Sequence, residues 1–192
     1  MAVFQDAGHA LHVSYLVHSL PARTVSPTAI VIDQLVKRNH VWDGVPAPKS
    51  SRVDFSGLSP LEVRAQCAQV ISMVNHLPHE AERYACHAIY GHQTIKADGV
   101  RGMARYVGPV LSVSQSEFAL YCAWHVFATA RQRDGLSQGD IAKHFGVSLS
   151  AVRHACATIQ RYARNMHGRA IDSLTIRFLA KDSDLIESDA VV

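Results

Sequence analysis

Apolar residues recur at helical spacing through most of this 192-residue chain, and alternation of apolar and polar residues never exceeds four or five positions. A serine-proline pair, a favourable helix start, precedes another helical pattern at Ser26-Pro27. Residues 40–57 are rich in glycine, proline and serine, which is typical of a loop or linker. Helices are predicted over residues 5–20, 61–77, 78–91, 100–107, 114–131, 138–145 and 149–166. The expected fold class is therefore all-α, a multi-helix bundle.

The same periodicity predicts which helix faces are buried. Residues 114–131 are apolar on too many sides for a surface helix, so we expect them at the centre of the core. In the helix over 61–77 the expected buried sector is Leu61, Ala65, Cys67, Ala68, Ile71 and Val74. In the helix over 149–166 it is Val152, Ala155, Cys156, Ile159, Ala163 and Met166.

Residues 138–157 (QGDIAKHFGVSLSAVRHACA) have the pattern of two short helices that cross at a tight turn. Gly146 can adopt the left-handed backbone that ends the first helix, because it has no Cβ. Ser148 can cap the second helix. The positions expected at the crossing are apolar or small: Ile141, Ala142, Phe145, Val147 and Val152. This pattern predicts a C-terminal helix-turn-helix, which binds duplex DNA in many proteins.

The net charge of +3 is unevenly distributed along the chain. Residues 1–130 hold 10 Lys and Arg against 9 Asp and Glu, and residues 131–177 hold 8 against 3. The residues from 178 onward hold 1 against 4. The positive excess therefore surrounds the helix-turn-helix pattern, where attraction to phosphate requires it. The alternative is a plain helical hairpin whose arginines face water.

If the second helix enters the major groove, its first turns meet bases and its later turns meet phosphates. Arg153 is the expected guanine contact, because its fork can donate to O6 and N7 together. The other residues expected near the bases are Ser148, Leu149, Ser150, His154 and Ala157. The residues expected on phosphates are Arg131, Arg133, Lys143, Arg161 and Arg164.

The stretch IAKHFGVSLSAVRHA resembles the helix-turn-helix of bacterial regulators and of sigma-factor region 4, in which Ile-Ala precedes a Gly-Val-Ser turn. No segment resembles the promoter-melting aromatic region of sigma factors. The layout, a helical front half before a C-terminal helix-turn-helix, also resembles small phage and prophage proteins that include Q-type late antiterminators. These resemblances imply double-stranded DNA as a partner and, for an antiterminator, RNA polymerase.

The pattern divides the chain into four parts. These are an N-terminal helical segment and linker (1–58), a helical core (59–130), the helix-turn-helix region (131–180) and an acidic tail (181–192). Residues 1–130 are expected to bind a partner or to form a homodimer, because specific operators often require two symmetric copies. A stripe of Ile171, Leu174 and Phe178 predicts a docking helix before a frayed tail.

Cys67, Cys86, Cys122 and Cys156 each fall on an apolar helical face and are expected to be buried thiols. The alternative is a structural zinc site, although no spacing matches a zinc motif. The candidate zinc ligands are Cys122 with His125, or His76 and His79 with Cys86 and His87. We expect no cofactor.

Signatures of catalysis do not occur in the sequence, which lacks a Gly-rich phosphate loop, Gly-x-Ser-x-Gly and His-Glu-x-x-His. His79, Glu80 and Glu82 form a dense polar group, which we expect to be the exposed first turn of a helix. No apolar run is long enough to span a membrane, and no signal peptide is recognisable. A cytoplasmic protein that is not an enzyme is expected.

The leading hypothesis is a DNA-binding transcription regulator of phage or bacterial type. The competing hypothesis is a protein-interaction module whose basic C-terminal helices bind RNA polymerase or another acidic partner.

Overall fold

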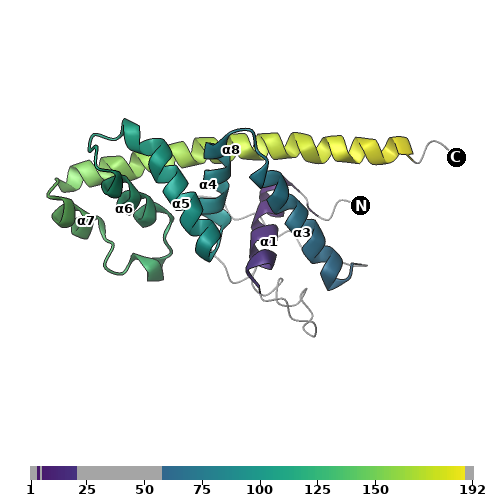
Figure 1. The fold of residues 1–192 in the computed structure, drawn as a ribbon, viewed down its shortest axis with the longest axis horizontal. Coiled ribbons are helices and arrows are strands. Elements are labelled where there is room, and N and C mark those ends of the chain that lie inside the picture. The colour runs from purple at the N-terminus through teal and green to yellow at the C-terminus, as the bar shows by residue number, and fades with distance from the viewer. Residues whose placement is uncertain (1–3, 5, 21–57, 189–192) are drawn as a thin grey trace. The chain divides into compact units, whose positions relative to one another are not determined.

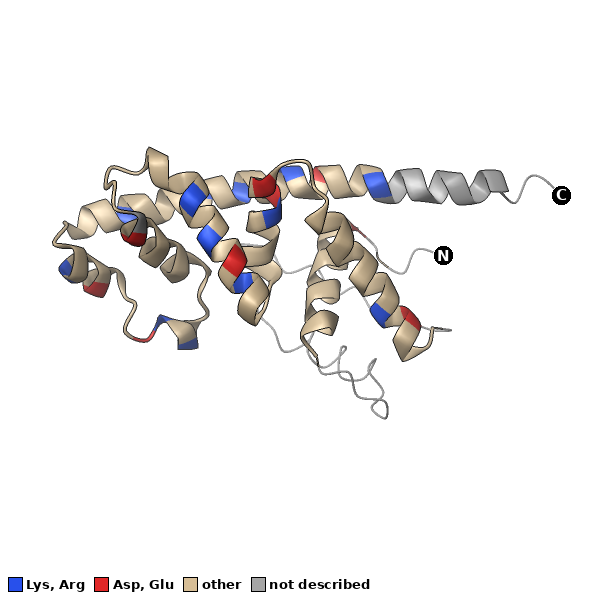
Figure 2. Ribbon diagram, viewed as in Figure 1, with Lys and Arg blue, Asp and Glu red and all other residues tan. Residues whose placement is uncertain are grey.

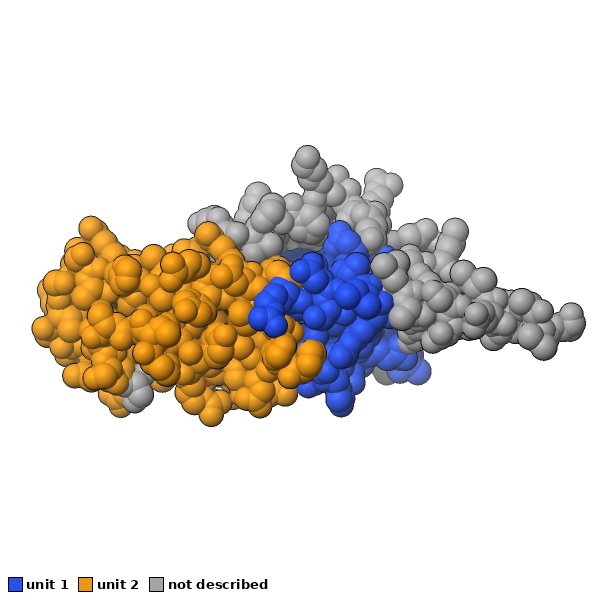
Figure 3. All heavy atoms as spheres, turned by 90° about the horizontal axis from the view of Figure 1, so that it is seen from above, with its two compact units in different colours: residues 1–77, 169–192 blue, residues 78–168 orange. Residues whose placement is uncertain are grey.

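The computed structural model describes residues 4, 6–20 and 58–188, with side chains as far as Arg177 except that of Ser116. All regular elements in these ranges are helices, which confirms the predicted all-α class (Figure 1). The chain divides into two compact units, Met1–Leu77 with Arg169–Val192 and Pro78–Gly168 (Figure 3). The helix predicted after Ser26-Pro27 and the linker predicted over 40–57 lie outside the described residues.

The first unit contains α1 (Ala7–Ser19), α3 (Pro60–Asn75) and the later part of α8 (Leu149–Ser188). Both short helices begin with a cap, because Asp6 accepts from the backbone N–H of His9 and Ser59 forms a capping box with Glu62. The two helices pack together. Their shared apolar cluster is Val13, Val17, Val63 and Cys67.

The buried stripe of α3 differs from the predicted one. Leu61 is 77% exposed, and Ala65 and Ala68 are exposed as well. The residues that are buried are Val63, Cys67, Val70, Ile71 and Val74. Both stripes have helical spacing, and the one that carries Val63 and Cys67 is chosen because it meets the valines of α1.

The second unit contains α4 (Glu80–Tyr90), α5 (Gln93–Val107), α6 (Ser116–Phe127), α7 (Gln138–Phe145) and the first part of α8. Two short 3₁₀ turns, η1 (Gly108–Val110) and η2 (Ala130–Arg133), separate these helices. Successive helices pack against one another, α4 on α5, α5 on α6 and α6 on α7 (Figure 1). Each helix from α5 to α7 therefore packs on the helix that precedes it in the chain.

Helix α5 starts at Gln93, seven residues before the predicted start. Gly99 lies inside it, where glycine normally weakens a helix. A Cβ at Gly99 would lie 2.3 Å from the backbone nitrogen of Ala88 and 2.6 Å from the carbonyl carbon of His87. This glycine is therefore the contact at which the backbones of α4 and α5 approach each other.

Helix α6 ends at Phe127 and not at 131, because Ala128 takes an extended conformation. Most of its apolar residues are buried, as expected for a core helix, namely Phe118, Ala119, Cys122, Ala123, Val126 and Phe127. Tyr121, at 36%, is the most exposed of its large apolar side chains.

Helix α8 begins at Leu149 as predicted and continues to Ser188 instead of ending near Met166. The separate docking helix predicted at Ile171 belongs to this same helix. Gly168 does not interrupt it, and nothing lies within 4 Å of a Cβ built there. The predicted buried face is confirmed at all six positions, namely Val152, Ala155, Cys156, Ile159, Ala163 and Met166. Of the predicted tail, residues 189–192 lie outside the described residues.

Candidate nucleic-acid interface

Helix α7 is defined at its start by a capping box. The backbone N–H of Asp140 donates to Ser137 Oγ at 3.1 Å, and the backbone N–H of Ser137 donates to Asp140 Oδ2 at 3.1 Å. Hydrogen bonds from the Ser137 hydroxyl, and then from its backbone, lower the pKa of the Asp140 carboxyl. These bonds allow a helix of only 8 residues to start at a fixed position.

The turn between α7 and α8 has the geometry that its residues predicted. Gly146 is left-handed, with φ 63° and ψ 31°. The Val147 N–H donates to the Ala142 carbonyl at 3.0 Å, and the Gly146 N–H donates to the Lys143 carbonyl at 3.4 Å. This is a Schellman ending. Two residues later, Ser148 Oγ accepts from the Ala151 N–H at 3.1 Å and caps α8.

Aromatic contacts hold α7 on α6. Ile141 is 1% exposed, and the Phe145 ring packs edge-on against Phe118 with centroids 5.5 Å apart. The His144 ring stacks on Tyr121 with centroids 5.3 Å apart and planes at 12°. Because α7 is anchored on α6, the turn and the start of α8 are presented in one arrangement.

Beneath the exposed surface, α6 and α8 meet through cysteines. The Cys156 thiol lies 4.0 Å from the Cys122 carbonyl oxygen. The hydrogen bond between the two thiols, together with burial, raises the pKa of the Cys122 thiol. Burial raises the pKa of Cys86 to about 12. All four cysteines are buried, as predicted, and all are free thiols.

Every predicted DNA-contacting residue is exposed. The set is Arg131, Arg133, Lys143, Ser148, Leu149, Ser150, Arg153, His154, Ala157, Arg161 and Arg164. Those on α8 share one side of the helix, opposite its buried stripe. Asn165 is also exposed there and was missed, although its position four residues after Arg161 could have identified it.

The exposed side of α8 carries positive charge without nearby acids on the helix. No Asp or Glu occurs between Asp140 and Asp172, and Figure 2 shows the first part of α8 accordingly with Lys and Arg only. Among the described residues, the guanidinium groups of Arg153 and Arg164 have no ion-pair or hydrogen-bond partner, and Arg161 only lies over the Tyr162 ring. These charges are therefore available to an external anion.

The two arginines before α7 are placed by η2. The Thr129 N–H and hydroxyl both donate to Gln132 Oε1, at 3.1 and 3.2 Å. Arg133 donates from Nε to the Ala128 carbonyl at 3.1 Å. That bond uses one donor of the exposed Arg133 guanidinium and leaves its Nη groups without a partner among the described residues.

The candidate zinc ligands do not come together in the described residues, and the polar group at 79–82 is only partly exposed. Within the described residues, no three His, Cys, Asp or Glu side chains come together to hold a metal ion. His76 instead donates from Nδ1 to the Ser72 carbonyl, and His125 donates to the Leu136 carbonyl at 2.8 Å. Glu82 is 1% exposed, so the expectation that the 79–82 turn is wholly exposed is wrong.

Of the helices that the structure describes, none combines the length and apolar character of a membrane span. No protein-family model matches the chain, and no curated protein is significantly similar to it.

Proposed function

We propose that this protein is a sequence-specific regulator of transcription that binds duplex DNA through a helix-turn-helix made of α7 and the first turns of α8. The observation that carries the proposal is the side of α8 with Arg153, Arg161 and Arg164, which is exposed, basic and free of acids. The capped α7 and the left-handed Gly146 support it, because they fix how the start of α8 is presented.

Two parts of the exposed side of α8 are proposed to contact different parts of the DNA. Arg153 and Arg161 are eight residues apart, about 12 Å along the helix axis. The major groove is also about 12 Å wide, so a helix that crosses the groove with Arg153 over base edges brings Arg161 toward the phosphates at the groove wall. In the proposed complex Ser150, Arg153 and His154 face the bases, and Arg161 and Arg164 contact the phosphate backbone.

In this arrangement the basic residues outside α8 contact the phosphate backbone of the DNA. Lys143 lies near the end of α7, and Arg131 and Arg133 lie on η2. Phosphate contacts of this kind position a protein without reading sequence, and they make binding strongly dependent on salt.

The test compares Arg153 variants with Arg161 variants. Sites selected from a random duplex pool by the wild-type chain are measured by mobility shift at several salt concentrations. Arg153→Ala should lose about 1–3 kcal/mol of discrimination at one base pair. Arg161→Ala should weaken all sequences alike and reduce the salt slope by about one. Arg153→Lys is the matched control, because it keeps the charge but loses the fork.

The form of the selected site refines the proposal. A palindrome indicates a homodimer with two helix-turn-helix copies. A single asymmetric site favours action beside RNA polymerase, as in antitermination. If the wild-type chain shows no salt-dependent binding to any duplex, the proposal is wrong and a protein partner for the basic helices takes its place.

A further inference from the structure

Arginines and tyrosines alternate across α4, α5 and α8 within the second unit. We call this set the Arg/Tyr chain; its members are Arg83, Tyr84, Arg105, Tyr106, Tyr162 and Arg161. The guanidinium carbons of Arg83 and Arg105 lie 5.3 and 5.8 Å from the centroid of the Tyr84 ring. Next to Arg105 in sequence, Tyr106 meets Tyr162 edge-on at 6.1 Å, and Arg161 lies 5.7 Å from the Tyr162 centroid. Ring contacts thus join α8 to α5 and α5 to α4, and on α5 the two contacts are made by the neighbouring residues Tyr106 and Arg105.

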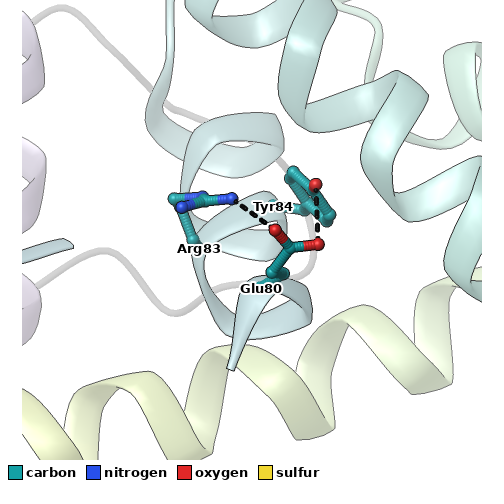
Figure 4. A network of polar contacts seen from close by, with 3 residues as sticks. All are labelled: Glu80, Arg83 and Tyr84. Carbon is teal, nitrogen blue, oxygen red and sulfur yellow. Dashed lines mark hydrogen bonds and ion pairs between the residues drawn. The ribbon is translucent and has the colours of Figure 1, made fainter. Parts of the chain in front are cut away.

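The α4 end of the Arg/Tyr chain is held in place. Glu80 accepts a hydrogen bond from Arg83 at 3.2 Å and another from the Tyr84 hydroxyl at 3.1 Å (Figure 4). The Tyr84 ring lies against Gly102 of α5, where a Cβ would be 2.2 Å from Tyr84 Cγ. A glycine at this position is therefore what allows the ring to sit under Arg105.

Arg105 is one of the residues that line a cleft of about 510 Å³. The cleft is lined by Tyr84, Asp98, Arg101, Arg105, Glu117 and Leu120. Its acids do not engage Arg105, since Asp98 pairs with Arg101 at 3.1 Å and no ion pair joins Glu117 to a described arginine. Arg83 is likewise paired with Glu80. The two members of the Arg/Tyr chain with unpaired charge, within the described residues, are Arg105 and Arg161.

We propose that Arg105, held in the Arg/Tyr chain, makes a second, sequence-independent contact with the phosphate backbone of the duplex that α7 and α8 bind; the inference thus rests on the function proposed above. A guanidinium held over a ring keeps its N–H donors free at the rim, in the fork geometry that matches phosphate. The Tyr84 ring already has two guanidinium groups over it, so it offers no open platform for stacking an unpaired base. The arrangement therefore suits a duplex backbone better than a single strand.

This contact should lie outside the segment of duplex that the first turns of α8 read. Arg161 already follows Arg153 by about 12 Å along the helix axis. Arg105 sits on a different helix, next to Tyr106, whose ring meets the Tyr162 ring beside Arg161. A phosphate bound by Arg105 would therefore lie near those that Arg161 contacts, away from the bases that Arg153 faces.

The test uses the full chain and a random-sequence duplex pool of about 24 base pairs. Binding of the wild type, Arg105→Ala and Arg101→Ala is measured by fluorescence anisotropy at several salt concentrations. Arg101→Ala is the matched control, because it removes the same charge from the same helix at a position already paired with Asp98.

We expect Arg105→Ala to weaken binding about fivefold and to reduce the salt slope by about 0.9, the value for one phosphate contact. Arg101→Ala should change binding less than twofold. If Arg105→Ala and Arg101→Ala weaken binding equally, the loss comes from the change in net charge, and the inference is wrong. Unchanged binding by Arg105→Ala, or tighter binding of the wild type to single strands, would also overturn it. If the inference fails but the double variant Arg153→Ala with Arg161→Ala loses DNA binding, the proposed function still stands. If the wild type does not bind DNA, both the inference and the proposed function are wrong.

Discussion

The two parts of α8 use arginine in opposite ways. In the first unit, Arg177 donates to the carbonyls of Met73 and His76 at the end of α3, at 3.5 and 3.2 Å. In the second unit, Arg153 and Arg164 are exposed and have no ion-pair or hydrogen-bond partner among the described residues. The former arginine stabilises a helix end, where unpaired carbonyls and the helix dipole favour a cation. The latter two contribute nothing visible to the fold.

This difference shows why an excess of charge does not by itself indicate a binding surface. Arg64 of the first unit also donates to a backbone carbonyl, that of Leu20, at 2.9 Å. Counting such arginines in the sequence overstates the charge available to a ligand. What supports the proposed ligand is the exposed charge of Arg153, Arg161 and Arg164 on the first part of α8.

The largest effect is expected from a substitution that disrupts the packing of α4 on α5, in the unit that carries the exposed arginines. Gly99→Ala places a Cβ within 2.3 Å of backbone atoms of α4, which cannot rotate away. We expect this to cost about 3 kcal/mol of unfolding free energy, at the upper end for overpacking. Urea denaturation followed by circular dichroism measures it.

Gly168→Ala is the control for this change, because it lies within α8 with nothing near the added Cβ. It should stabilise the protein by about 0.5–1 kcal/mol through helix propensity. If both substitutions are stabilising, α4 and α5 do not approach as closely as described.

The turn at the candidate site was predictable because its chemistry is local. The left-handed Gly146 and the cap at Ser148 depend on residues within a few positions. The same holds for the start of α8 at Leu149 and for its buried stripe. The capping box at Ser137 is equally local and was overlooked, although a Ser followed three residues later by Asp is its usual signal.

Features that depend on distant residues were not predictable. Glycine propensity argues against a helix at Gly99, but the approach of α4 requires glycine there. The stripe chosen by α3 depends on the valines of α1, more than 40 residues away in the chain. The contact between Tyr106 and Tyr162 likewise joins two helices whose sequences give no sign of it.

The next largest effect is the loss of stability in acid that we expect from two histidines, the buried His9 of the first unit and the half-buried His87 of the second. His9 is 2% exposed, and neither ring nitrogen has a hydrogen-bond partner in the described residues. Burial lowers the pKa of His9, and burial together with Arg83 lowers the pKa of His87 to about 4. Since the unfolded chain takes up these protons near pH 6.5, stability should be complete above that pH and fall progressively toward pH 4.

Replacing one histidine at a time measures how much each one contributes to the loss of unfolding free energy in acid. Between pH 7 and pH 5, His87→Gln should remove on the order of 1 kcal/mol of the loss in unfolding free energy, after allowance for the partial exposure of the ring. His9→Gln should also make the unfolding free energy fall less between pH 7 and pH 5. A wild-type protein equally stable at pH 7 and pH 5 would show that these rings are already accessible to protons.

The smallest expected effect tests the comparison of arginines directly, with two substitutions on one helix. Arg177→Ala should lower the unfolding free energy by about 1 kcal/mol, because two carbonyls at the end of α3 lose a charged donor that is partly exposed. Arg164→Ala should leave stability within about 0.5 kcal/mol, as is usual for an exposed helical position. In DNA binding the order should reverse, with a several-fold loss for Arg164→Ala and none for Arg177→Ala. Because both variants remove one positive charge from α8, equal effects of the two on DNA affinity would mean that net charge, and not the exposed side of its first part, attracts the nucleic acid.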